Sequence, residues 1–178
     1  EKTQDYGKKI IFLSDRKMIL ESIKLKNNYL SKDLKLNIIN EQSKSKISNN
    51  LLIKNITIDS KATNKNDIFF AIQGKKNDGN KFVSEVLQKK ASLAIVNRIN
   101  KNCAISKQIK VKNSLNFLTK CSSIYRNNIS AKVISITGSC GKTTLKEMIG
   151  YVLKKISKTT YSPKSFNNKY GVPLSLFN

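Results

Sequence analysis

The stretch Ile136 to Thr144, "ITGSCGKTT", constrains the fold of this chain more than any other part of the sequence. The β-prone run "KVISIT" leads into its glycines. The residues after it place apolar side chains on one helical face: Leu145, Met148, Ile149, Val152 and Leu153. A strand that turns through glycines into a helix directs N–H groups and the helix dipole at one point, which suits a phosphate group. The stretch therefore predicts a strand, a phosphate-binding loop and a helix.

The residue types in this loop match that chemistry. Gly138 and Gly141 would let the backbone approach the phosphates, Lys142 would neutralise the β and γ oxygens, and the Thr143 hydroxyl would ligate Mg²⁺. A plain strand–turn–helix joint would explain the glycines but not a lysine followed by two threonines. Cys140 is interpreted as a small loop residue, because a thiol mechanism would lack a histidine partner. Kinases, GTPases and ATP-dependent ligases all use such loops, so the loop leaves the reaction open.

Composition narrows the possible classes of protein. The 178 residues, 39% of them apolar, suffice for one ordinary domain or two small ones. The net charge of +23 suggests a nucleic-acid partner, but only three of the 34 basic residues are arginine and the lysines are scattered. We therefore expect a solvated lysine-rich surface, with a nucleic-acid-binding module as the alternative.

Three cysteines and no histidine support neither a disulfide framework nor a zinc site, and a reducing cytoplasm fits best. No apolar run is long enough for a membrane span.

The remaining pattern alternates strands and helices, which predicts an α/β fold. Strands are expected at 8–13, in "LLIKNITID", in "DIFFAI" and at 92–96. Helices are expected around Met18 to Leu25, Leu34 to Ile39, Phe82 to Leu87 and Leu115 to Tyr125, with a polar turn over Gly74 to Asn80.

Three motifs in order give a resemblance to a known family. They are "TIDSKATNKNDIFFAIQGKKNDGNKF", the short loop G-x-x-G-K-T-T, and "KSFNNKYGVPLSL". Together they resemble the Mur ligase family, whose N-terminal domain carries D-S-R, G-D-x-F-x-A-x-x-G and D-G-H-x-F patterns. The Asn-Asn and Gly-Val-Pro signature resembles the MurF type, which adds D-Ala-D-Ala to UDP-MurNAc-tripeptide. The resemblance implies a small α/β substrate-binding domain, followed by the start of a P-loop central ATPase domain with a parallel sheet.

The resemblance also implies roles for individual residues. The loop would hold ATP through Gly138, Ser139, Cys140, Gly141, Lys142, Thr143 and Thr144, with Lys142 and Thr143 as the catalytic residues and Thr143 as the Mg²⁺ ligand. The UDP-sugar substrate would lie near Asp59, Ser60, Lys61, Asn167 and Asn168. The chain departs from the family pattern at Lys61, which replaces an arginine, at Asn80, which replaces a histidine, and at Lys164-Ser165, where many relatives have Gly-Asn.

The implied reaction is amide-bond formation. ATP would phosphorylate the terminal carboxylate of UDP-MurNAc-tripeptide, and the amine of D-Ala-D-Ala would attack the acyl phosphate. By this resemblance, we expect the parent protein to be a cytoplasmic ligase. The sequence ends at Asn178, before the family's other catalytic groups, so we expect this chain alone to be inactive. Activity of the MurE type, in which an amino acid is added instead, is the nearest alternative, although that type typically has a Thr-Thr-Pro sequence in place of the Asn-Asn and Gly-Val-Pro signature.

The resemblance further suggests a domain division. Residues 1–27 are similar to the C-terminal end of a MurE-type ligase, which suggests a fused MurE–MurF polypeptide; the alternative is an unusual N-terminal extension. Residues 28–49 would form a linker and a short helix, 50–112 the UDP-sugar-binding domain, and 113–178 the beginning of the ATP-binding domain. The protein is expected to be monomeric.

Overall fold

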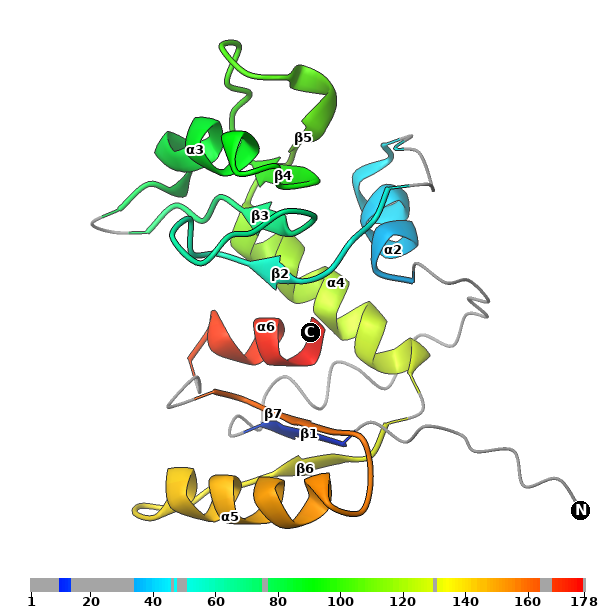
Figure 1. Cartoon of the computed structure of the whole chain (residues 1–178), viewed down its shortest axis with the longest axis vertical. Helices are drawn as coiled ribbons and strands as arrows, with labels where there is room; N and C mark the ends of the chain where they lie inside the picture. Colours follow the sequence, from blue (N-terminus) through cyan, green and yellow to red (C-terminus); the bar gives the residue numbers. More distant parts are fainter. Residues whose placement is uncertain are drawn as a thin grey trace, which may run out of the picture. The chain divides into compact units, whose positions relative to one another are not determined.

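The computed structural model describes residues 10–13, 34–45, 47, 51–74, 77–129, 131–163 and 168–177. The chain divides into two compact units. One, here called the four-stranded unit, comprises Leu30–Cys121. The other, here called the three-stranded unit, comprises Glu1–Tyr29 and Ser122–Phe177. Every strand pairing in both sheets is parallel, so the predicted α/β class with a parallel sheet is confirmed (Figure 1).

The four-stranded unit has the strand order β2-β3-β4-β5, in which chain neighbours are also sheet neighbours. Its elements are α2 (Leu34–Ser43), β2 (Ile56–Thr57), β3 (Ile68–Phe70), the 3₁₀ helix η2 (Gly79–Phe82), α3 (Val83–Gln88), β4 (Leu93–Val96), the 3₁₀ helix η3 (Ile105–Lys107), β5 (Gln108–Lys110) and the first part of α4 (Ser114–Asn128).

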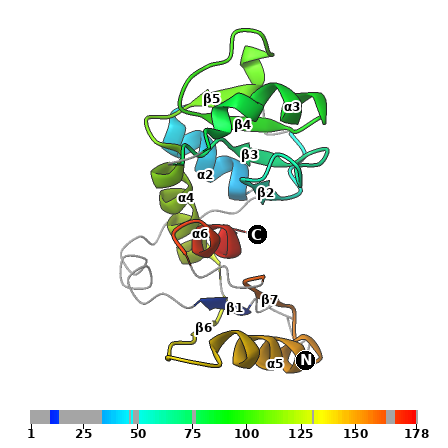
Figure 2. The ribbon, with the colours of Figure 1, turned by 90° about the vertical axis from the view of Figure 1, so that its left-hand side faces the viewer.

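Both faces of this sheet are covered, as the continuous apolar runs of a parallel sheet require. On one face, Val83 and Val86 of α3 pack with alternate strand residues, among them Phe69 and Ala94. On the other face, the ring of Phe70 stacks on Phe117 of α4 with the ring centroids 6.3 Å apart. Figures 1 and 2 show α3 and α4 on opposite sides of the sheet. Packing of α3 and α4 on the two faces holds the strands in place, and with them the starts of the loops that follow the strands.

The three-stranded unit has the strand order β6-β1-β7. Its elements are β1 (Ile10–Leu13), β6 (Val133–Ser135), α5 (Lys142–Lys154), β7 (Thr159–Tyr161) and α6 (Gly171–Phe177), together with the end of α4. The crossover from β6 through α5 to β7 therefore skips one position in the sheet. The backbone of Ile10–Leu13, from the other end of the sequence, occupies that position and pairs with both neighbours.

Helices also cover both faces of the smaller sheet. Figures 1 and 2 show α5 on one side and α6 on the other. Helix α6 packs Val172 and Leu176 against Ile129 and Val133, and its Phe177 meets the ring of Tyr125 edge to face. Pro173 is tolerated because it lies in the first turn of α6, where its missing N–H would have no partner within the helix. In the described part of the chain, no helix combines the length and the hydropathy that a membrane span requires.

Most predicted elements are present, with shorter strands than the patterns indicated. "LLIKNITID" contains a strand only at Ile56–Thr57. Among the strands and α-helices of the described residues, three were not predicted at all: β5, β7 and α6. The short 3₁₀ helix η3 was not predicted either. The predicted apolar face of α5 exists but is exposed, with Met148 62% and Val152 54% accessible. The predicted helix around Met18 to Leu25 lies outside the described residues.

Candidate functional site

The phosphate-loop sequence forms the predicted strand–loop–helix arrangement at the carboxyl end of β6. Helix α5 begins at Lys142, directly after Gly141. Gly138 has φ of 152° and Gly141 has φ of 73°, and both are conformations that residues with side chains adopt only with strain. A Cβ atom at Gly141 would meet no other atom within 4 Å. The glycine there is therefore required by backbone conformation, and open space lies at the helix N-terminus.

Lys142 folds back over its own loop. Its Nζ donates hydrogen bonds to the carbonyl oxygens of Gly138 and Ser139. Ser139, Cys140, Thr143 and Thr144 are exposed. The loop thus presents an ammonium group and two hydroxyl-bearing helix residues on an accessible surface, which suits a ligand with several anionic oxygens.

The residues present fit a magnesium nucleotide. In the part of the chain that the structure describes, no group of three or more Cys, Asp or Glu side chains could hold a metal ion. Mg²⁺ bound with a nucleotide needs only one or two protein ligands, because phosphates and water supply the rest. The hydroxyl of the exposed residue Thr143, one residue beyond Lys142, is suited to serve as such a protein ligand.

A second strand end lies at the same edge of this sheet. Because β7 is parallel to β1 and β1 to β6, Ser162 follows β7 on the edge where the phosphate loop follows β6. The buried Lys146 of α5 donates to the Ser162 carbonyl oxygen at 2.6 Å. Farther along, the Asn168 side chain accepts hydrogen bonds from the backbone of Tyr170 and Gly171, which helps to start α6. Asn167 lies outside the described residues.

In the four-stranded unit, Asp59, Ser60 and Lys61 form a tight turn after β2. The Asp59 carboxylate accepts the N–H of Lys61 at 2.9 Å, and the Thr63 hydroxyl donates to the Asp59 carbonyl oxygen at 2.8 Å. Lys89, at the end of α3, donates to the Ser60 carbonyl oxygen at 2.8 Å and pairs with Glu85. The turn is held from both sides, while the Asp59 and Lys61 side chains stay exposed.

A polar network joins the loops that follow β3 and β4. Asn80, at the position where the family pattern has histidine, donates to the Asp78 carboxylate at 2.7 Å and accepts the N–H of Asn97 at 3.0 Å. Arg98 forms an ion pair with Asp78. The Asn80 hydrogen bonds, and then the Arg98 charge, lower the pKa of Asp78 despite its partial burial. Asp78 thus remains a carboxylate that ties the two loops together.

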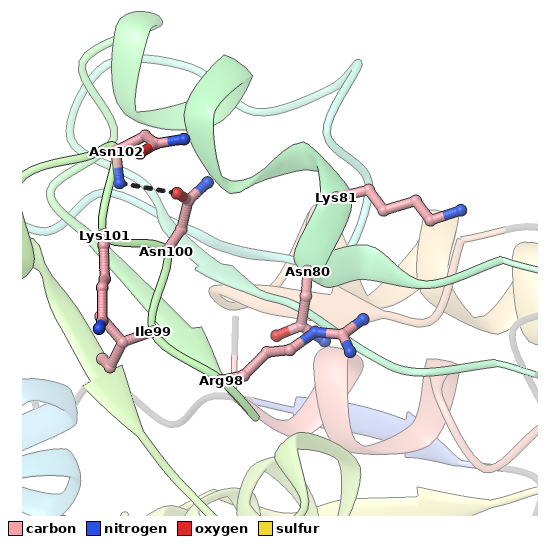
Figure 3. Close-up of a pocket in the computed structure, with 7 residues that line it drawn as sticks. All are labelled: Asn80, Lys81, Arg98, Ile99, Asn100, Lys101 and Asn102. Carbon is pink, nitrogen blue, oxygen red and sulfur yellow. Dashed lines mark hydrogen bonds between the residues drawn. The ribbon is translucent and has the colours of Figure 1, made fainter.

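A pocket of about 330 Å³ opens beside this network (Figure 3). It is lined by Asn80, Lys81, Arg98, Ile99, Asn100, Lys101 and Asn102. Sequence reasoning singled out Asn80 but missed the Arg98 side of the pocket. Two features of the sequence could have indicated this residue: arginine is rare in this chain, and Arg98 lies two residues after the buried strand β4.

Comparisons with known proteins match most of the chain. The model described as "Mur ligase family, catalytic domain" matches residues 52–136, and the model described as "Mur ligase middle domain" matches residues 136–178. Among curated sequences, the UDP-N-acetylmuramoyl-tripeptide–D-alanyl-D-alanine ligase of Buchnera aphidicola subsp. Baizongia pistaciae is 36% identical over 71% of this chain and 27% of its own length. That of Haemophilus influenzae is 28% identical over 86% of this chain and 33% of its own length.

A relative of another type matches a shorter part. The UDP-N-acetylmuramoyl-L-alanyl-D-glutamate–2,6-diaminopimelate ligase of Clostridium tetani is 41% identical over 58% of this chain and 22% of its own length. The chain therefore spans no more than about a third of these relatives.

Solved structures of MurF proteins share the fold. MurF from Thermotoga maritima in complex with ADP has a TM-score of 0.59 and 34% identity, covering 74% of this chain and 30% of that one. MurF from Acinetobacter baumannii has a TM-score of 0.67 and 31% identity, covering 79% of this chain and 32% of that one. The two adjoining family matches, the related sequences and these structures show that the chain belongs to the Mur ligase family.

Proposed function

We propose that this chain forms the ATP-binding and UDP-sugar-binding part of a ligase of the MurF type. The parent enzyme would join D-Ala-D-Ala to UDP-MurNAc-tripeptide in peptidoglycan precursor synthesis. The observation that carries the proposal is the phosphate loop, with Gly138 and Gly141 at positive φ and Lys142 at the start of α5. The relatives named as ligases of this type, and the MurF structure that contains ADP, support it.

The residues of the loop would act by position and charge. Exchange of its carbonyl contacts for phosphate oxygens would let Lys142 neutralise the charge that develops during phosphoryl transfer. Thr143 would hold Mg²⁺ through its hydroxyl. Bound ATP supplies the phosphoryl group that activates the substrate carboxylate, and the loop keeps that group fixed in space.

The turn at Asp59, Ser60 and Lys61 would bind the UDP-sugar substrate through its exposed Asp59 and Lys61 side chains and the largely buried Ser60. Asn167 and Asn168 are proposed as substrate-binding residues as well. Support comes from the position of the turn at the carboxyl edge of a parallel sheet, where ligands of α/β proteins bind. In Asn168, however, the side-chain oxygen is already engaged with α6, which leaves its amide nitrogen for a ligand.

Activity of the MurE type is the second candidate, because one relative with 41% identity is a diaminopimelate ligase. The two candidates differ in the peptide that the UDP-sugar carries. Titration of the purified chain with UDP-MurNAc-tripeptide and UDP-MurNAc-dipeptide, followed by calorimetry, tests the choice. The MurF type predicts tighter binding of the tripeptide, whereas a preference for the dipeptide would favour the MurE type. Saturable binding of neither compound would refute the substrate proposal.

Further parts of the proposal concern the whole protein. We propose a monomeric cytoplasmic parent, domain limits at 28–49, 50–112 and 113–178, and a MurE-like origin for residues 1–27. The gene sequence upstream of the codon for Glu1 tests that origin. An open reading frame that encodes the rest of a MurE-type ligase would support it, and a start codon just before Glu1 would contradict it.

A further inference from the structure

Lys146 is a charged side chain buried in the helix that begins at the phosphate loop. Only 8% of its side chain is accessible, against 46% for the neighbouring Glu147. Lysine is among the residue types that are least often buried, because an ammonium group leaves water only where partners replace the water. Packing alone would favour an apolar side chain at this place, so the buried charge needs another explanation.

The partners of this ammonium group lie at the carboxyl end of β7. The Nζ of Lys146 donates to the Ser162 carbonyl oxygen at 2.6 Å and lies 5.9 Å from the ring centroid of Tyr161, the last residue of that strand. A carboxylate oxygen of Glu147 lies 3.1 Å from the same Nζ and supplies a negative charge. Hydrogen bonds from a charged donor are stronger than those from a neutral one. Lys146 therefore attaches α5 firmly to the end of β7.

Lys146 is also close to the phosphate loop along the helix. Helix α5 begins at Lys142, so Lys146 follows four positions later on the same helical face. The N–H of Leu145 donates to the Gly141 carbonyl oxygen at 2.9 Å, which joins this turn to the loop. The end of β7 and the phosphate loop lie at the same edge of the sheet. A shift of α5 relative to β7 would therefore move the Lys142 side chain and the N–H groups of the helix start together.

We propose that Lys146 is a positioning residue for the nucleotide site. Its hydrogen bond to Ser162 holds the first turns of α5 in the position at which the loop can surround the phosphate groups, and Lys146 itself does not touch the nucleotide. A binding site loses affinity when the hydrogen bonds that support it are removed, even if its own contacts with the ligand remain. The inference rests on the proposed function, because it concerns the ATP-binding loop.

The test compares two lysines of α5 that lie beside the same ring. The Nζ of Lys154 lies 4.6 Å from the Tyr161 centroid, but Lys154 is an exposed residue. In calorimetry, Lys146→Met should bind Mg-ATP and Mg-ADP about 3- to 30-fold more weakly than the wild-type chain, as expected for a residue that acts through others. Lys154→Met, which removes the same charge from the same helix, should bind both like the wild type. Lys146→Arg, which keeps a cationic donor, should recover most of the affinity.

A second measurement needs no nucleotide. NMR spectra of the ligand-free chains should show shifted amide signals for Gly138 to Gly141 in Lys146→Met, whereas Lys154→Met should leave these signals in place. Circular dichroism should show that each variant is folded. If Lys146→Met does not fold, Lys146→Gln replaces it, because glutamine removes the charge and keeps a polar side chain, and the same losses are expected.

The outcomes separate this inference from the proposed function. If the folded wild-type chain does not bind ATP, the nucleotide proposal fails, and the loop signals of Lys146→Met alone decide whether Lys146 positions the loop. If the wild-type chain binds ATP and Lys146→Met binds it equally well, the inference is overturned and the nucleotide proposal stands.

Three further results would also overturn the inference. A loss of affinity for ATP without a loss for ADP would mean that Lys146 contacts the γ-phosphate directly. Equal losses in Lys146→Met and Lys154→Met would mean that only the charge of the helix matters. Binding by Lys146→Arg as weak as that by Lys146→Met would mean that the cationic hydrogen bond is not the cause.

Discussion

Gly79 is a position where a single missing side chain decides the local structure. A Cβ atom there would lie 2.7 Å from the Ile72 nitrogen and 2.9 Å from the Ala71 carbonyl carbon, both of which are backbone atoms. The N–H of Gly79 donates to the Ile72 carbonyl oxygen at 2.9 Å. This close approach brings Asp78 and Asn80 to the edge of the sheet. The glycine of the D-G-H-x-F pattern is therefore required here because a side chain would clash with the backbone.

Replacement of this glycine should therefore destabilise the four-stranded unit. We expect Gly79→Ala to lower the free energy of unfolding by about 1–3 kcal/mol, because backbone must move to admit the methyl group. Urea unfolding of the purified variant measures this effect. The control Gln88→Ala, at the exposed end of α3, should stay within about 0.5 kcal/mol of the wild type. A Gly79→Ala chain as stable as its control would show that the loop has room for a side chain.

The cysteines should differ sharply in reactivity. Burial raises the pKa of Cys121 to about 12, whereas Cys140 is exposed in the phosphate loop. At pH 8 only about one Cys121 side chain in ten thousand would be thiolate, the reactive form. A thiol reagent at this pH should label Cys140 in the folded chain and reach Cys121 only after unfolding, as mass spectrometry of peptides can show. Labelling of both residues at equal rates in the folded chain would contradict the burial of Cys121.

At the scale of elements, the contact between α5 and β7 depends on a glycine in a helix. A Cβ atom at Gly150 would lie 2.5 Å from Cδ1 of Tyr161, so the ring lies directly against the helix backbone. The Nζ of Lys154 lies 4.6 Å from the centroid of the same ring. One helical turn before Gly150, the Nζ of Lys146 donates a hydrogen bond to the Ser162 carbonyl oxygen. These contacts connect the helix of the phosphate loop to the end of a neighbouring strand.

Gly150→Ala places two effects in opposition. Alanine favours a helix over glycine by about 1 kcal/mol, but the clash with Tyr161 should cost about 1–3 kcal/mol. We expect the single variant to be less stable than the wild type, and the same change in a Tyr161→Ala background to be stabilising. A double-mutant cycle by thermal unfolding measures the coupling. Equal effects of Gly150→Ala in both backgrounds would mean that the helix and the ring do not meet as described.

At the scale of the whole molecule, elements formed by consecutive residues could be predicted from the sequence. Elements that depend on contacts between distant residues could not. The loop between β6 and α5 was predictable because strand, glycines and helix follow one another in the chain. Strand β7 was missed because its three residues gain a partner only through pairing with β1, as with Ile10 and Thr159. Strand β5 was missed because a polar residue such as Gln108 is expected at the surface. It is buried here because its side-chain amide forms two hydrogen bonds with the backbone of Asn100.

The same limit applies to the candidate site. The candidate residues Asp59 to Lys61 and the phosphate loop could be named from motifs, since each lies within a few consecutive residues. The turn at Asp59 was not predicted, because "LLIKNITID" was expected to form a strand. The pocket at Arg98 forms only when the loops after β3 and β4 come together through Asp78 and Asn80. No single stretch of the sequence carries that information.

The net charge of +23 also acts on the whole molecule. Repulsion among so many lysines opposes the compact state and is screened by salt. We expect the melting temperature to rise by a few degrees when NaCl is increased from about 20 to about 200 mM, since the Debye length shortens over that range. Differential scanning calorimetry in a buffer without phosphate measures this. A melting temperature that falls with salt would indicate that attractive ion pairs dominate instead.

Binding of Mg-ATP to the purified chain tests the central claim most directly. Calorimetry should give saturable binding at one site. Lys142→Ala should weaken it by about 10- to 100-fold, the loss expected for one charged hydrogen-bonding group. Lys158→Ala, an exposed lysine before β7, should match the wild type, and circular dichroism should show that both variants are folded. Absence of saturable ATP binding by the folded wild-type chain, or equal affinity of the Lys142→Ala chain, would contradict the assignment of "ITGSCGKTT" as the nucleotide site.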